Sequence, residues 1–266
     1  MSIKVVSCFV CLKLSTVRQP FSEDERVERV NQIETKRPEA ILFDLGSTLL
    51  LDSLSGGLNT RVRSLLKRDT FATYVEKDFD LPTTLADTMD TIYRDGLEEF
   101  HVREWLVSHI KTDSLDSAGS PETLERHIRT TILSYTPPVD SGRVLRELMD
   151  LDIPMGVVSN SIFSAELLRE DLVALSVIEA FQFVVSSAEF GLRKPHPAIF
   201  TDAVDKLNAR PETTWYVGDL WENDVLGSTG AGLIPVWLNA HAETPEDAVP
   251  HHRARNWTEL GELLGV

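Results

Sequence analysis

Residues 39–51 read EAILFDLGSTLLL, an apolar run that stops at the carboxylate of Asp44 and then passes into glycine, serine and threonine. A continuous apolar run of this kind is typical of a strand that is buried on both faces, and here its carboxyl end leads into a polar loop. Open α/β sheets bind their ligands at the carboxyl ends of the strands. The stretch therefore predicts an α/β fold with Asp44 at the functional edge of its sheet.

Three later stretches carry similar polar groups. They read GVVSN at 156–160, GLRKP at 191–195 and WYVGD at 215–219. The first is an apolar run that ends in Ser159 and Asn160, and the third ends in Asp219, with Asp224 five residues further on. The second places Lys194 directly before a proline. The order and the spacing of the four stretches carry the signal, because any one of them would occur by chance.

In their order and spacing, the four stretches resemble the motifs of the haloacid dehalogenase superfamily, in the branch that hydrolyses phosphate esters. The resemblance covers about residues 39–239. It implies that Asp44 is a nucleophile that forms an aspartyl-phosphate, which water then hydrolyses. It also implies that Lys194 supplies a fixed positive charge between Asp44 and the phosphate. The substrate expected from the resemblance is a small phosphorylated metabolite.

The same resemblance implies a Mg²⁺ site and a phosphate site. The Mg²⁺ ligands would be Asp44, the backbone carbonyl of Gly46, Asp219 and Asp224, a set of hard oxygen donors that suits this ion. The phosphate would be bound by Ser159 and Asn160 together with Lys194. Because these side chains follow separate strands, the prediction depends on the sheet bringing the strand ends together.

One position departs from the pattern. In the phosphatase branch, the residue two after the nucleophile is usually a second Asp that protonates the leaving oxygen, but here it is Gly46. General acid–base catalysis is typically worth ~10²–10⁴-fold in rate. A substrate with a good leaving group would not need this proton, or Asp52 or a residue of the inserted helices could supply it.

Other functions are also compatible with a glycine at position 46. The chain could be a 2-haloacid dehalogenase, since displacement of halide needs no proton, although Asp219 and Asp224 favour a metal-dependent enzyme. A phosphonate hydrolase would need a Schiff-base lysine, for which Lys67, Lys77 and Lys111 are available. The chain could also bind ligands with weak or no catalysis. We rank the Mg²⁺-dependent hydrolase first.

The spacing of apolar residues predicts three parts. A helical cap domain is expected at 54–136, because helical periodicity fills the interval between the first and second strands, which is too long for one crossover. A Rossmann-like core domain is expected at 38–53 and 137–266, with three layers around a parallel sheet. Residues 1–37 form an N-terminal extension with a helix expected at 21–36.

Within the core, strands and helices alternate. Strands are expected at 155–158, 183–185, 215–217 and 234–238, and helices at 144–149, 163–175 and 198–207, with a loop at 241–255 before a last short helix. His196 is expected to begin a helix. The other histidines singled out show no metal spacing and are expected at the surface; they are His101, His109, His127, His251 and His252.

The composition limits the class of protein. The 266 residues are 42% hydrophobic and 26% charged, with a net charge of −16, and the absence of a basic patch argues against a nucleic-acid partner. No apolar run approaches the ~20 residues that span a bilayer, so no membrane partner is expected. Cys8 and Cys11 are the two cysteines, and they favour reduced thiols and a cytoplasmic location. No particular oligomeric state is favoured.

Overall fold

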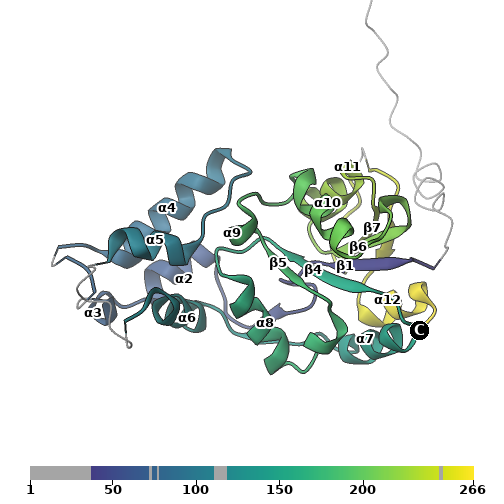
Figure 1. The fold of residues 1–266 in the computed structure, drawn as a ribbon, viewed down its shortest axis with the longest axis horizontal. Helices are drawn as coiled ribbons and strands as arrows, with labels where there is room; N and C mark the ends of the chain where they lie inside the picture. Colours follow the sequence, from purple (N-terminus) through teal and green to yellow (C-terminus); the bar gives the residue numbers. More distant parts are fainter. Residues whose placement is uncertain (1–36, 72–73, 77, 111–118, 246–247) are drawn as a thin grey trace, which may run out of the picture.

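The computed structural model describes residues 37–71, 74–76, 78–110, 119–245 and 248–266. The helix expected at 21–36, the two cysteines, Lys77 and Lys111 lie outside the described residues. The described chain begins with β1, which lies in the middle of a six-stranded sheet (Figure 1). Within these residues, no helix combines the length and the apolar character needed to cross a membrane.

The sheet is parallel throughout. Its strands are β1 (Ala40–Phe43), β4 (Met155–Ser159), β5 (Val184–Ser186), β6 (Thr214–Gly218), β7 (Ile234–Leu238) and β8 (His252–Ala254). They run in the order β5-β4-β1-β6-β7-β8, and β1 pairs in parallel with both β4 and β6. The carboxyl ends of β4, β1 and β6 therefore lie side by side at one edge of the sheet.

Helices cover both faces of this sheet. They are α7 (Ser141–Asp150), α8 (Ala165–Ala174), α9 (Ser187–Phe190), α10 (Pro197–Lys206), α11 (Gly227–Gly230) and α12 (Trp257–Leu264). Alternate residues of β1 enter different cores: Ile41 and Phe43 pack with α7, α8 and α12, whereas Ala40 and Leu42 pack with α10. This alternation confirms the three-layer α/β fold and explains the continuous apolar run, because both faces of β1 are buried.

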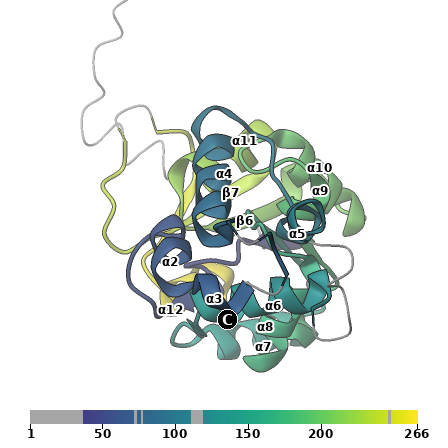
Figure 2. The ribbon, with the colours of Figure 1, turned by 90° about the vertical axis from the view of Figure 1, so that its left-hand side faces the viewer.

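Between β1 and α7 the described chain forms five helices, which lie as a body beside the sheet (Figures 1 and 2). They are α2 (Leu58–Leu65), α3 (Arg68–Phe71), α4 (Leu81–Asp95), α5 (Val102–His109) and α6 (Pro121–Ile132). Their apolar stripes form a cluster of their own, joined from the core by Ile162, Phe163 and Leu167. Two short strands, β2 (Leu51–Asp52) and β3 (Tyr135–Thr136), pair antiparallel where the chain enters and leaves this body.

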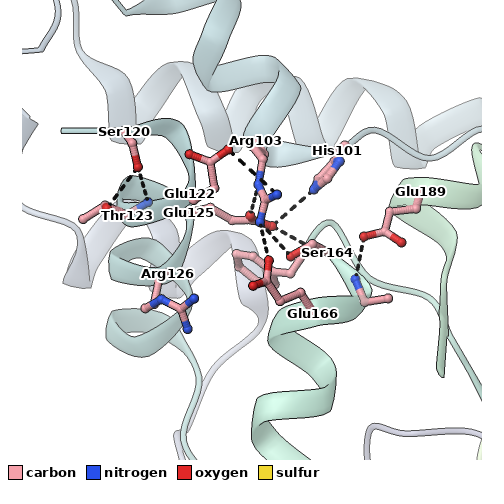
Figure 3. Close-up of polar contacts among 12 residues, drawn as sticks. His101, Arg103, Ser120, Glu122, Thr123, Glu125, Arg126, Ser164, Glu166 and Glu189 are labelled. Carbon is pink, nitrogen blue, oxygen red and sulfur yellow. Dashed lines mark hydrogen bonds and ion pairs between the residues drawn. The ribbon is translucent and has the colours of Figure 1, made fainter. Parts of the chain in front are cut away.

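A buried carboxylate joins the helical body to the core (Figure 3). Glu125 of α6 is fully buried and accepts hydrogen bonds from Arg103 Nε at 2.6 Å and from the backbone N–H of Ser164 at 2.7 Å. His101 Nε2 lies 3.3 Å from the same carboxylate. Burial alone would raise the pKa of Glu125, but the hydrogen bonds from these three donors hold it below its usual value. Glu125 thus stabilises the entry to α8.

Several local predictions were wrong. The segment 241–255 was expected to be a loop, but it contains β8, whose residues alternate between buried and exposed. His251 and His252 were expected at the surface, yet both are buried against aromatic rings, with the ring of His252 4.5 Å from that of Trp215. The side chain of His101 is only 9% exposed. Imidazole can pack as an aromatic ring, and composition alone does not reveal this.

Candidate active site

The strand order brings the predicted polar residues to one cavity. Asp44 follows β1, Ser159 ends β4 and Asp219 follows β6, the three neighbouring strands in the middle of the sheet. These residues, with Lys194 and others, line a cavity of about 320 Å³ between the sheet edge and the helical body. Asp44 is held there by its backbone, because its N–H donates to Val217 of β6 at 2.8 Å.

Lys194 is the central cation of the site and is only 2% exposed. Its Nζ donates to Asp44 Oδ1 at 2.5 Å, to Asp224 Oδ1 at 2.7 Å and to the hydroxyl of Tyr216 at 2.7 Å. Burial alone would lower the pKa of Lys194, but the carboxylates of Asp224 and Asp44 raise it well above its usual value. Lys194 is therefore a permanent positive charge with all three donors engaged.

The side chain of Asn160 fixes the backbone that carries Lys194. Its Oδ1 accepts from the backbone N–H of Lys194 at 2.7 Å, and its Nδ2 donates to the backbone carbonyl of Lys194 at 3.0 Å. Both polar atoms of the amide are thus used to position the lysine. Ser159, only 4% exposed, lines the cavity beside it.

Three carboxylates converge at the same edge. Asp44, Asp219 and Asp224 each place one oxygen so that the three atoms lie within 4.8 Å of one another. Burial raises the pKa of Asp44 to about 6, with Lys194 acting in the opposite direction. Burial and the neighbouring Asp44 and Asp224 raise the pKa of Asp219 to about 7.

Two glycines shape this site in different ways. A Cβ at Gly218 would collide with the carboxyl group of Asp224, so only glycine lets that carboxylate approach the end of β6. Asp224 lies on a π-helical turn, Trp221–Leu226, and its Oδ2 accepts from the backbone N–H of Leu220 at 2.9 Å. At Gly46, by contrast, a Cβ would meet no heavy atom within 4 Å.

The donor set fits a hard divalent cation such as Mg²⁺. Three carboxylate oxygens converge, and the backbone of Gly46 lines the same cavity. Oxygen donors of this kind are the ligands that Mg²⁺ takes in proteins. The residues singled out in the sequence for a metal and for phosphate therefore line, or lie against, one continuous site.

Residues of the helical body and of the segment that follows it complete the cavity, and the sequence did not single them out as site residues. They are Leu58, Arg61, Tyr93, Leu133 and Tyr135. Their positions repeat at helical spacing or lie in a short strand, so nothing in the sequence sets them apart from core residues. Arg193, next to Lys194, lies over the ring of Tyr93 with its guanidinium carbon 4.2 Å from the ring centroid.

Asp52 was considered as a proton donor and Lys67 as a Schiff-base lysine, and neither is among the described lining residues of the cavity. Asp52 forms an ion pair with Arg61 at 2.6 Å. Lys67 is exposed at the end of α2. His196 begins α10 as expected, with its Nδ1 accepting from the backbone N–H of Ala198 at 3.2 Å.

Comparisons with known proteins show which family this chain resembles. A family model described as haloacid dehalogenase-like hydrolase matches residues 78–237. Glyceraldehyde 3-phosphate phosphatase of Methanopyrus kandleri is 26% identical over 199 residues, 74% of this chain and 82% of that protein. Phosphoserine phosphatase of Thermus thermophilus is 32% identical over 216 residues, 78% of this chain and 84% of that protein.

The fold is also similar to that of proteins with another named activity. A 2-haloacid dehalogenase from Pseudomonas syringae pv. Tomato DC3000 matches with a TM-score of 0.59 at 18% identity, covering 85% of this chain and 97% of that chain. A fold shared at this level of identity hosts more than one chemistry. The reaction must therefore be argued from the side chains of the site.

Proposed function

The chain belongs to the haloacid dehalogenase-like hydrolases, and from this we propose that it hydrolyses a small phosphomonoester with the help of Mg²⁺. One observation carries the proposal: three carboxylates converge around a buried lysine at the end of the central strand. A halide-displacing site has no use for the two further carboxylates, Asp219 and Asp224. Both sequence relatives described above are named as phosphatases, which supports the same conclusion.

Asp44 is the proposed nucleophile. Lys194 holds its Oδ1 at 2.5 Å, which fixes the orientation of the second oxygen. Attack by this carboxylate on phosphorus forms the aspartyl-phosphate bond and breaks the bond to the leaving oxygen, which takes up a proton. Water then attacks the phosphorus of the intermediate, which releases inorganic phosphate and restores the carboxylate of Asp44.

Other residues of the site bind and orient. Asp44, Asp219, Asp224 and the backbone carbonyl of Gly46 would hold Mg²⁺, which when bound supplies positive charge next to the phosphoryl oxygens. The hydroxyl of Ser159 would donate to a phosphoryl oxygen. Asn160 contributes by fixing Lys194, and its side-chain amide is already engaged in that task.

The five helices between 54 and 136 are proposed to act as a cap over the site. Arg61 of α2 and Tyr93 of α4 line the same cavity as Asp44. Exclusion of water by such a cap strengthens the electrostatic contacts inside the site. The paired strands β2 and β3 join the cap to the core, and they are proposed as the place where its movement begins.

The decisive experiment is hydrolysis of p-nitrophenyl phosphate and acetyl phosphate with and without Mg²⁺. Their leaving groups need little protonation, so the missing acid at position 46 matters least for them. Asp44→Asn should lower turnover by more than ~10³-fold, because it removes the nucleophile. Asp150→Asn, at an exposed position on α7, is the matched control and should leave turnover unchanged.

Three outcomes would refute the proposal. Turnover that survives Asp44→Asn would assign the activity to another site, and turnover that is independent of Mg²⁺ would remove the role of the carboxylates. No turnover of either substrate would leave a ligand-binding protein or, if halide is released from 2-haloacids, a dehalogenase.

A further inference from the structure

Arg61 is a buried guanidinium in the wall of the cavity, on the first helix of the helical body. The residue is 8% exposed, and its Nη1 is anchored twice. It donates to the backbone carbonyl of Ile132 at 2.8 Å and lies 2.6 Å from Asp52 Oδ2. Asp52 lies in β2, where the chain enters the helical body, and Ile132 ends α6, shortly before the chain leaves it, so the side chain is fixed near this junction.

The Nε of the same side chain is buried and makes no hydrogen bond to any described residue. Most buried polar groups are paired, because a buried donor without a partner loses its hydrogen bond to water and gains none in the protein. Both anchors use the Nη1 end of the guanidinium. The edge formed by Nε and Nη2, which presents two parallel N–H groups, is the edge that binds a carboxylate in bidentate fashion.

The surroundings of Arg61 define the group that would pair with it. Asp44 lies in the wall of the same cavity of about 320 Å³, which restricts the substrate to a small molecule. Tyr135, which pairs with Asp52 across the short ladder, lines the cavity too. Leu58 and Leu133 give this wall an apolar surface, beside which a charge-assisted hydrogen bond is stronger than in bulk water.

We propose that Arg61 binds a carboxylate of the substrate, so that the preferred substrates are small phosphomonoesters that also carry a carboxylate. This inference rests on the proposed phosphatase function. The phosphoryl group would lie at Asp44 and Lys194, while the carboxylate pairs with the Nε edge of Arg61. Arg61 is thus a specificity-determining residue, and it takes no part in the transfer of the phosphoryl group.

The test compares kcat/KM for 3-phosphoglycerate and glycerol 3-phosphate, which differ only in a carboxylate against a hydroxymethyl group. The wild-type protein should prefer 3-phosphoglycerate by about 10–10²-fold, the range expected for a hydrogen bond to a charged group. Arg61→Gln should reduce this preference to about onefold. Arg61→Lys keeps the positive charge but lacks the paired N–H donors of the guanidinium, so it should retain only part of the preference.

Arg63→Gln is the matched control. Arg63 lies on the same helix, but its Nη2 pairs with Asp87 and Asp90 at 2.6 and 3.0 Å, and it is absent from the described lining of the cavity. This variant should keep the wild-type preference. Because the readout is a ratio of two substrates, a general loss of folding or activity in an Arg61 variant would not imitate the expected result.

The outcomes separate the two proposals. Turnover of p-nitrophenyl phosphate without a preference for 3-phosphoglycerate overturns the role of Arg61 and leaves the phosphatase intact. So does a preference that Arg61→Gln retains, or a preference for glycerol 3-phosphate, which would assign a hydroxyl group to this wall. No turnover of any phosphate overturns both.

Discussion

Replacing Gly46 by aspartate tests how much catalytic rate this protein loses because position 46 lacks a general acid. Gly46 does not have a positive φ, and a Cβ added there meets no heavy atom within 4 Å. The position lines the cavity two residues after Asp44. The new side chain therefore fits without strain, and the free energy of unfolding should change by less than about 1 kcal/mol.

The size of the effect depends on the leaving group. A placed general acid is worth about 10²–10⁴-fold, which corresponds to about 3–5 kcal/mol in the barrier. The carboxylates of Asp44 and Asp219 near position 46 favour the protonated form of the new carboxyl group, which is the form that acts as an acid. Gly46→Asp should therefore raise kcat for glycerol 3-phosphate by about 10²-fold or more. For p-nitrophenyl phosphate it should change kcat by less than about fivefold.

The assay measures kcat for both substrates in the wild-type protein, Gly46→Asp and Gly46→Asn. Asparagine has nearly the same shape as aspartate but cannot act as a general acid. The difference in kcat between the two variants therefore measures acid catalysis and not a steric effect. If Gly46→Asp behaves like Gly46→Asn with both substrates, the wild-type protein already has a proton donor, and the argument from position 46 is wrong.

Three further changes have expected outcomes. Gly218→Ala should lower kcat by more than ~10²-fold, because its methyl group collides with Asp224; steady-state kinetics measures this, and near-wild-type activity would refute the proposed role of the close approach. Glu125→Gln should lower the free energy of unfolding in urea by about 1.5–3 kcal/mol, since it weakens the hydrogen bonds that Arg103 and Ser164 donate to a fully buried carboxylate. Glu122→Gln, on the same helix but 53% exposed, should cost less than about 1 kcal/mol, and equal effects would contradict the burial argument. Burial lowers the pKa of His252 from 6.5 to about 4, so the folded protein binds fewer protons than the unfolded chain in this range; stability should fall by about 2 kcal/mol from about pH 7.5 to about pH 5, a loss that His252→Phe should remove from the urea titrations.

The parallel sheet could be predicted because its strands carry an unambiguous signal. Residues of β1, β4 and β6 are buried on both faces, which requires continuous apolar runs. The short ladder of β2 and β3 was not predicted, because two residues a strand are too few to show any periodicity. The same argument applies to β8, whose buried residues include a histidine that the sequence marks as polar.

The side chains at the strand ends could be predicted for a topological reason. Parallel strands that neighbour one another end at the same edge, so Asp44, Ser159 and Asp219 come together once the strand order is known. Tyr216 was not predicted as a partner of Lys194, because it lies within an apolar strand and only its hydroxyl reaches the lysine, at 2.7 Å. Arg61 was missed because its partners are about 9 and 71 residues away along the chain.

The charges of the site connect the proposed metal with the proposed substrate. Asp44, Asp219 and Asp224 outnumber the one ammonium group among them, and Lys194 already donates to two of these carboxylates. A phosphate dianion entering such a site would meet an excess of negative charge, which is costly in a cavity of low dielectric constant. Binding of a divalent cation offsets that excess, so phosphate binding and metal binding should be mutually dependent. Arg61 lies outside this cluster, and its Nε has no hydrogen-bond partner among the described residues, so a second anionic group of the substrate could be bound there without competing for the cations that bind the phosphate.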